Sequence, residues 1–152
     1  YIDEKEGTDT MEEDLKKLYD EGKKAFGFYC GKGEWFLLTL KNIDFMSQML
    51  PDVSKASQSL DVSVLHTLIL EKIFGIDKEN MAKQINLTYT KFFTEAIDGV
   101  DKGEFQCSFV LNPTRVTEIR DVAAAGEKMP QKSTYFYPKM ITGMVMNNLG
   151  VD

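Results

Sequence analysis

The amino-acid sequence predicts an α+β fold in which a mixed β-sheet carries a β-hairpin and helices pack over it. Two β-prone runs, 25–30 and 35–40, flank a glycine-containing turn at 31–34, which is typical of a hairpin with antiparallel strands. Further along, segments with the 3.6-residue period of helices alternate with segments of two-residue period. A strand–helix–strand order needs a right-handed crossover if its strands are parallel neighbours, and a mixed sheet accommodates both this crossover and the antiparallel hairpin.

The first half of the chain holds two predicted helices. Residues 1–22 are expected to form an exposed, charged lead-in and then a helix, because Thr10 and Glu13 have the spacing of a capping box. After the hairpin, a serine-rich loop leads to Asp61, which begins the clearest helix. Its apolar residues fall on one stripe at helical period and are Val62, Leu65, Ile69 and Ile73.

The second half is predicted to alternate strands and helices. Apolar and polar residues alternate at 85–89 and again at 105–111, as in half-buried strands. Helical patterns follow each of these segments, at 90–102 and 114–125. Two further β-prone segments, Ser133–Tyr137 and Ile141–Met146, close the chain.

Length and charge narrow the classes of function. The 152 residues fit a single domain over 1–152, with a core over 23–148, and 43% hydrophobic residues suffice for that core. The net charge of −6 opposes direct binding to nucleic acid and to anionic membrane surfaces. Without a signal peptide or a long apolar stretch, the chain is expected to be cytoplasmic. It begins at Tyr1 without a methionine, so we expect either an excised piece or the tail of a longer protein.

The residue types that most often carry chemistry are sparse. Cys30 and Cys107 stand singly and are expected to be small buried hydrophobes rather than a disulfide framework. The sole histidine, His66, lies at the edge of an apolar stripe and is expected to be a buried, structural residue. No metal-ligand set and no nucleophile–base pair is recognisable, so we expect no catalytic residues and no turnover by the chain alone. Nothing in the sequence identifies a cofactor.

One segment near the carboxyl end has the composition of an anion-binding site. Residues 126–140 hold three lysines against one glutamate in an otherwise acidic chain. Hydroxyls, aromatic rings and ammonium groups along one strand can hold a phosphate or stack a base. The candidate ligand-binding residues are Lys132, Ser133, Thr134, Tyr135, Tyr137 and Lys139. The alternative is a strand with one face in the core and lysines that extend outward to solvent.

Two long motifs resemble a bacterial and archaeal family of unknown activity, domain of unknown function 1015. They are Leu60–Glu71, with the sequence LDVSVLHTLILE, and Ala125–Met140, with the sequence AGEKMPQKSTYFYPKM, preceded by Leu111–Thr114. The resemblance spans about residues 24–148 and implies a place at the carboxyl end of the family's longer proteins. Their amino-terminal part resembles ParB-type partition proteins and free-serine kinases through an Asp-Gly-His-His-Arg run, which this chain lacks.

The resemblance implies an accessory carboxyl-terminal domain that covers or completes a ParB-like nucleotide- or ligand-binding module. Its expected partner is the amino-terminal domain of the same polypeptide. Two alternatives stay open. In one, segment 132–139 contributes a phosphate- or nucleotide-binding element to a small-molecule kinase-like site. In the other, the chain is a dimerisation module.

Overall fold

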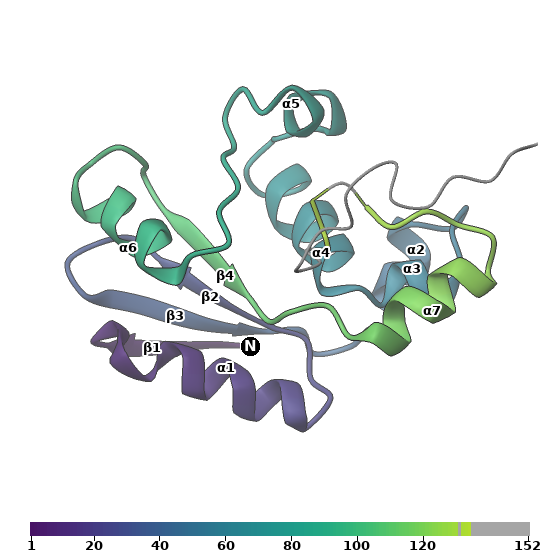
Figure 1. The fold of residues 1–152 in the computed structure, drawn as a ribbon, viewed down its shortest axis with the longest axis horizontal. Coiled ribbons are helices and arrows are strands. Elements are labelled where there is room, and N and C mark those ends of the chain that lie inside the picture. The colour runs from purple at the N-terminus through teal and green to yellow at the C-terminus, as the bar shows by residue number, and fades with distance from the viewer. Residues whose placement is uncertain (131, 135–152) are drawn as a thin grey trace, which may run out of the picture.

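Four strands form one antiparallel sheet, with helices against both of its faces (Figure 1). The computed structural model describes residues 1–130 and 132–134. The strands lie in the order β1-β3-β2-β4 and are β1 (Ile2–Glu6), β2 (Ala25–Tyr29), β3 (Glu34–Thr39) and β4 (Ser108–Leu111). The predicted α+β class is confirmed.

The β2–β3 hairpin forms as predicted, and its turn explains the glycines. Gly31 and Gly33 flank Lys32, and all three have positive φ angles, of 99°, 77° and 58° respectively. Glycine tolerates that region without the steric cost that a Cβ imposes. The turn therefore depends on its two glycines, as the pattern indicated.

The expectation of a mixed sheet is wrong for the described residues, because β4 also pairs antiparallel with β2. Helix α6 (Phe93–Asp101) precedes β4 and ends beside the hairpin, where the Asp101 carboxylate accepts a 2.6 Å hydrogen bond from the Tyr29 hydroxyl. Strand β4 then starts at Ser108, opposite Tyr29. Because β4 enters the sheet at the hairpin end, it runs away from the hairpin. Strand β2 runs toward the hairpin, so the two strands are antiparallel.

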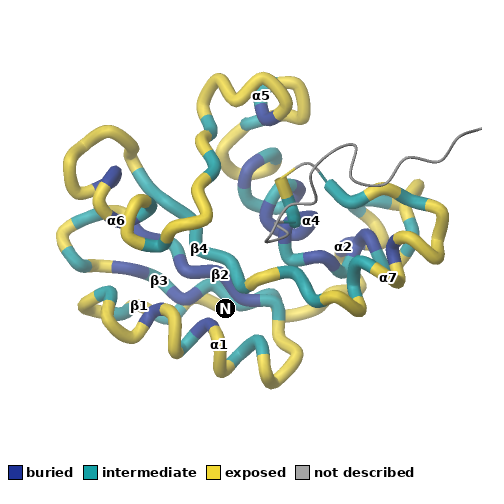
Figure 2. Tube along the Cα trace, in the orientation of Figure 1, coloured by how far each residue is buried: buried dark blue, intermediate teal, exposed yellow. Residues whose placement is uncertain are grey.

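The segment 85–89, predicted as a strand, belongs to no ladder in the described part of the chain. Half-buried and exposed residues nevertheless alternate along this segment. Leu87 and Tyr89 are half-buried while their neighbours are exposed, and Leu87 packs against the core. Figure 2 shows this connection between α5 (Lys78–Lys83) and α6 as largely exposed chain. Extended backbone with one side on a helix therefore produced the pattern without a neighbouring strand.

The expected lead-in is partly a strand. Strand β1 pairs with β3, with Ile2 opposite Leu38 and Glu6 opposite Glu34. Helix α1 (Met11–Asp20) follows a short 3-10 turn, η1 (Thr8–Thr10), as predicted. The capping box is wrong, because Thr10 makes no side-chain cap hydrogen bond.

Helices α1 and α6 cover one face of the sheet. Their apolar residues close a core with the inward side chains of the strands, including the fully buried Trp35. Its buried members are Met11, Leu15, Ala25, Tyr29, Trp35, Leu37, Ile97 and Val100. Alternation along each strand sends the remaining side chains to the opposite face.

The opposite face is covered at one end by α2 (Phe45–Met49), α4 (Asp61–Val64), η2 (Leu65–Glu71) and α5. The predicted helix from Asp61 continues as the π-helix η2, where the Phe74 amide reaches the Ile69 carbonyl at 3.0 Å, five residues back. This wider turn shifts the apolar stripe. Ile73, expected in the core, is therefore 74% exposed.

A third cluster joins the two motif regions. Leu60 and Val62 pack against Val122 of α7 (Val116–Ala124), and α3 (Lys55–Gln58) lies against the same helix. Residues 133 and 134 are not in a strand, and the rest of the two closing β-prone segments lies outside the described residues. Among the described helices, none has the length and hydropathy needed to cross a membrane.

Candidate functional site

The structure describes three of the six predicted ligand-binding residues. Lys132 is exposed and has a positive φ of 62°, while Ser133 and Thr134 are half-buried. Tyr135, Tyr137 and Lys139 lie outside the described residues. A ligand-binding site formed by all six residues therefore remains a prediction.

Ser133 has a structural task. Its hydroxyl donates to the Pro130 carbonyl at 2.6 Å, and its own carbonyl accepts from the Thr114 hydroxyl at 2.7 Å. These bonds join the chain that leaves α7 to the chain that enters it. The Ser133 hydroxyl is thus engaged in a turn, which reduces its capacity to bind an anion.

A second link joins the end of α7 to α3. The Glu127 carboxylate accepts 2.7 Å hydrogen bonds from the Ser54 amide and the Ser54 hydroxyl, and another from the Ser57 hydroxyl. These hydrogen bonds hold the pKa of Glu127 below its ordinary value because they stabilise the carboxylate, and the bond from Ser57 has the largest effect. Ser54 is also the N-cap of α3 and accepts from the Ser57 amide. We interpret this set as a latch that fixes α3 against α7.

Beside the latch lies an open hollow of about 490 Å³. Its size suits a small ligand. Its charge does not suit a phosphate, because two carboxylates face a single lysine. The lining residues are Leu50, Asp52, Val53, Ser57, Ser63, Glu127, Lys128 and Pro130.

A half-buried ionic cluster lies where the sheet meets the helices. The Lys24 ammonium is 2.9 Å from the Asp61 carboxylate and 2.8 Å from that of Glu118. Burial raises the pKa of Asp61, and the hydrogen bond from Lys24 opposes that rise. Arg115 donates its main-chain amide to Glu118 at 2.8 Å and lays its guanidinium 3.8 Å from the Tyr19 ring centre. Asp61 and Glu118 share the one Lys24 ammonium, and Arg115 adds a nearby positive charge, so we interpret the cluster as a structural contact between the sheet and the helices.

His66 is half-buried, less than the full burial expected of it. Its ring lies edge-on to Tyr89, with ring centres 6.5 Å apart, and burial lowers its pKa. Within the described residues, no group of three or more histidine, cysteine or carboxylate side chains could hold a metal ion. The structure thus places His66 at a packing contact.

The opposite face of the sheet, which we call the open face, has an unusual content. Its residues form rows across the strands, and burial declines toward the hairpin, since Phe26 is buried whereas Phe28 is half-buried. One row contains Phe36, Phe28 and Phe109, which we call the aromatic row. Phe28 stacks on Phe109 with ring centres 4.9 Å apart, and Phe74 packs edge-on against both. Phe74 is still 45% exposed, and the three rings of the row are half-buried.

Three glutamates border the aromatic row. Glu4 lies opposite Phe36, and Glu6 lies opposite Glu34 in the next row. All three carboxylates are exposed, and none forms an ion pair with another residue in the described ranges. Like charges directly opposite each other destabilise a sheet, so the pairing of Glu6 with Glu34 lowers the stability of the isolated chain.

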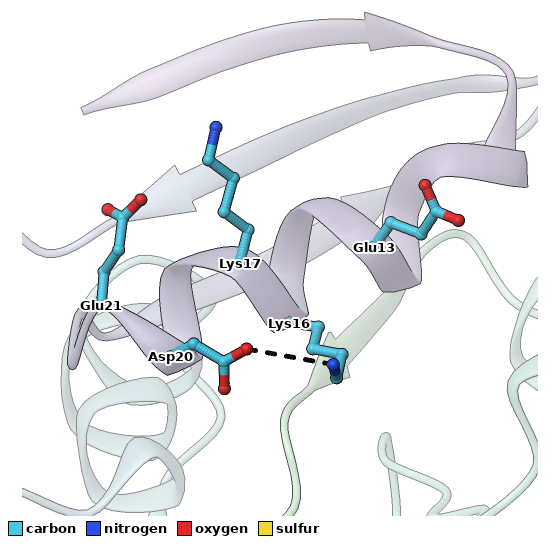
Figure 3. Close-up of a pocket in the computed structure, with 5 residues that line it drawn as sticks. All are labelled: Glu13, Lys16, Lys17, Asp20 and Glu21. Atoms are coloured by element: carbon cyan, nitrogen blue, oxygen red, sulfur yellow. Dashed lines mark ion pairs between the residues drawn. The ribbon is translucent and has the colours of Figure 1, made fainter.

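A second hollow, on the outer side of α1, has the character of an ordinary solvated helix surface. Figure 3 shows its five charged side chains, Glu13, Lys16, Lys17, Asp20 and Glu21, extending from one helix and its end. The ion pair between Lys16 and Asp20 is 3.9 Å long and well exposed. Such exposed ion pairs contribute little to the free energy of unfolding.

Sequence reasoning missed the ionic cluster, the latch and the open face. A comparison with protein-family models, curated proteins and solved structures gives no match. The candidate site therefore rests on geometry, and the open face is the strongest candidate because half-buried aromatic rings lie beside three exposed glutamates that form no ion pair among the described residues.

Proposed function

We propose that this chain is a non-catalytic accessory domain that binds another folded module through its open face. The observation that carries the proposal is the aromatic row beside three exposed glutamates. Large exposed apolar patches with polar borders are typical of protein interfaces. Aromatic residues are also enriched where interfaces derive most of their binding energy.

The charge of the open face indicates which kind of partner could bind there. The strand side chains of this face include three glutamates and neither lysine nor arginine, at Ile2, Glu4, Glu6, Phe26, Phe28, Glu34, Phe36, Leu38, Phe109 and Leu111. A second copy of this chain, itself at −6, would bring like charge to the interface. Nucleic acid is disfavoured for the same reason. A module with an apolar centre and a basic border is complementary.

The resemblance to domain of unknown function 1015 points to a source for that module. In this proposal the partner is the amino-terminal part of the same natural polypeptide, with a ParB-like core. The chain would complete or cover it without supplying reacting groups. Segment 132–139 remains a separate candidate for anion binding.

The proposal is tested by producing the remainder of the natural polypeptide as a separate chain and titrating it with residues 1–152 in a calorimeter. Charge reversal by Glu4→Lys with Glu34→Lys is expected to weaken binding at least about tenfold, because both carboxylates lie beside the aromatic row. Phe74→Ser is expected to weaken it as well.

Two variants serve as controls on other surfaces. Glu13→Lys makes a single reversal of the same kind on the outer side of α1, and Val116→Ser removes an apolar side chain that is 79% exposed on α7. Both should bind as the parent chain does. The proposal fails if no binding is detected, if the open-face variants bind normally, or if residues 1–152 form a dimer through this face.

A further inference from the structure

The two cysteines, far apart in sequence, each lie one residue beyond the last pair of the β2–β4 ladder. Tyr29 at the end of β2 lies opposite Ser108 at the start of β4. Because the strands are antiparallel, extending this register by one residue brings Cys30 opposite Cys107. Strand alternation puts both side chains on the open face, in the row beyond Phe28 and Phe109. Both thiols are free, with Cys30 exposed and Cys107 half-buried.

Cross-strand spacing is compatible with a disulfide. Opposed residues of an antiparallel pair have Cα atoms about 4.5 or 5.5 Å apart, depending on their hydrogen bonding. A disulfide accepts Cα separations of about 4.4–6.8 Å, so either type of pair qualifies. Burial raises the pKa of Cys107, and the nearby Cys30 sulfur raises it further, which is consistent with the proximity that the register gives.

We propose that Cys30 and Cys107 form a thiol pair that closes to a cross-strand disulfide when it meets a small-molecule disulfide such as oxidised glutathione. The Cys30 thiolate attacks one glutathione sulfur, the glutathione S–S bond breaks, and one glutathione thiolate leaves. The Cys107 thiolate then attacks the Cys30 sulfur and releases the second glutathione. In balance, two electrons and two protons pass from the cysteine pair to oxidised glutathione, which yields one protein disulfide and two molecules of reduced glutathione.

The order of attack follows from exposure. Cys30 is open to solvent at the end of β2, so the oxidant reaches it first. Cys107 is partly covered, and burial raises its pKa above the ordinary value, so it suits the second, intramolecular step, where proximity compensates for its reduced thiolate fraction.

The reaction is measured by equilibrating residues 1–152 with mixtures of reduced and oxidised glutathione, with and without urea. We expect the folded chain to yield a single intramolecular disulfide, found as one Cys30–Cys107 cross-linked peptide in a non-reducing digest. The equilibrium constant should be at least on the order of tenfold larger than in urea, because the unfolded chain must close a long loop. The melting temperature should rise on oxidation, since the bond constrains the unfolded state.

Single variants define the pathway. Cys107→Ala should stop at one glutathione on Cys30, and Cys30→Ala should react more slowly than Cys107→Ala. The proposal is overturned by two glutathione adducts without a cross-link, by disulfide-linked dimers, by an equal equilibrium constant in urea, or by a lower melting temperature after oxidation.

Discussion

Two buried glycines with nearly equal clashes should respond oppositely to alanine. A Cβ at Gly27 of β2 would lie 2.8 Å from the Met11 sulfur, and one at Gly99 of α6 would lie 2.7 Å from the Phe105 ring. The two sites differ in whether the side chain that the new Cβ would meet can move. Met11 is fully buried between α1 and the sheet, whereas Phe105 is 41% exposed and can swing into solvent.

The expected magnitudes follow from that contrast. Overpacking a rigid core costs about 1–3 kcal/mol, and the smaller entropy of the unfolded alanine chain offsets about 0.4–1 kcal/mol of it. Gly27→Ala should therefore destabilise by up to about 2.5 kcal/mol. Gly99→Ala gains up to about 1 kcal/mol of helix propensity once Phe105 moves, so it should be neutral or stabilising.

Urea unfolding of both variants measures the free energies. Adding Met11→Ala to Gly27→Ala removes the obstructing sulfur, so the double variant should be at least about 0.5 kcal/mol more stable than the two single changes predict by addition. The reasoning is refuted if Gly27→Ala stabilises the fold, or if the double variant is additive.

Three further perturbations have defined outcomes. Lys24→Met leaves two half-buried carboxylates unpaired and should cost on the order of 1–3 kcal/mol in urea unfolding, against under about 0.5 kcal/mol for Lys16→Met on the solvated face of α1. His66→Gln should abolish a loss of stability on acidification through pH 6.5, because the lowered pKa of His66 means that the unfolded chain binds the proton more readily; an unchanged pH profile would contradict this. Glu127 contributes stability above its ordinary pKa of 4.5 that disappears as pH falls through its lower folded value, so Glu127→Gln should converge with the parent chain in acid, and divergence there would exclude the latch.

Much of the fold could be predicted from local pattern. Helix α1, the β2–β3 hairpin, α6 and α7 each follow from apolar spacing and turn residues within one segment. Strand β1 could not, since its sequence IDEKE is mostly charged and it forms by pairing with β3, far along the chain. The sheet direction was mispredicted for a related reason. It is set by where α6 delivers the chain, which periodicity does not contain.

The candidate site was harder to predict, because its parts depend on contacts between distant segments. Ser54 and Glu127 meet only through the packing of α3 on α7, and Lys24 meets Glu118 only because the residue before β2 lies beside α7. Each residue alone has an unremarkable context. Cys30 and Cys107 are the clearest case, because their separate apolar runs indicated two buried hydrophobes. Only the register of β2 with β4 reveals a facing pair.

The position of that pair gives a test that connects the two proposals. Cys30 lies on the open face, one row from Phe28, so a module docked on the aromatic row should shield it. Alkylation of Cys30 in residues 1–152 should therefore slow when the remainder of the polypeptide is added, and the slowing should disappear with Glu4→Lys and Glu34→Lys. The Cys107→Ala background keeps a single thiol and excludes disulfide closure. An alkylation rate unchanged at saturating partner would place the interface elsewhere, while leaving the chemistry of the thiol pair intact.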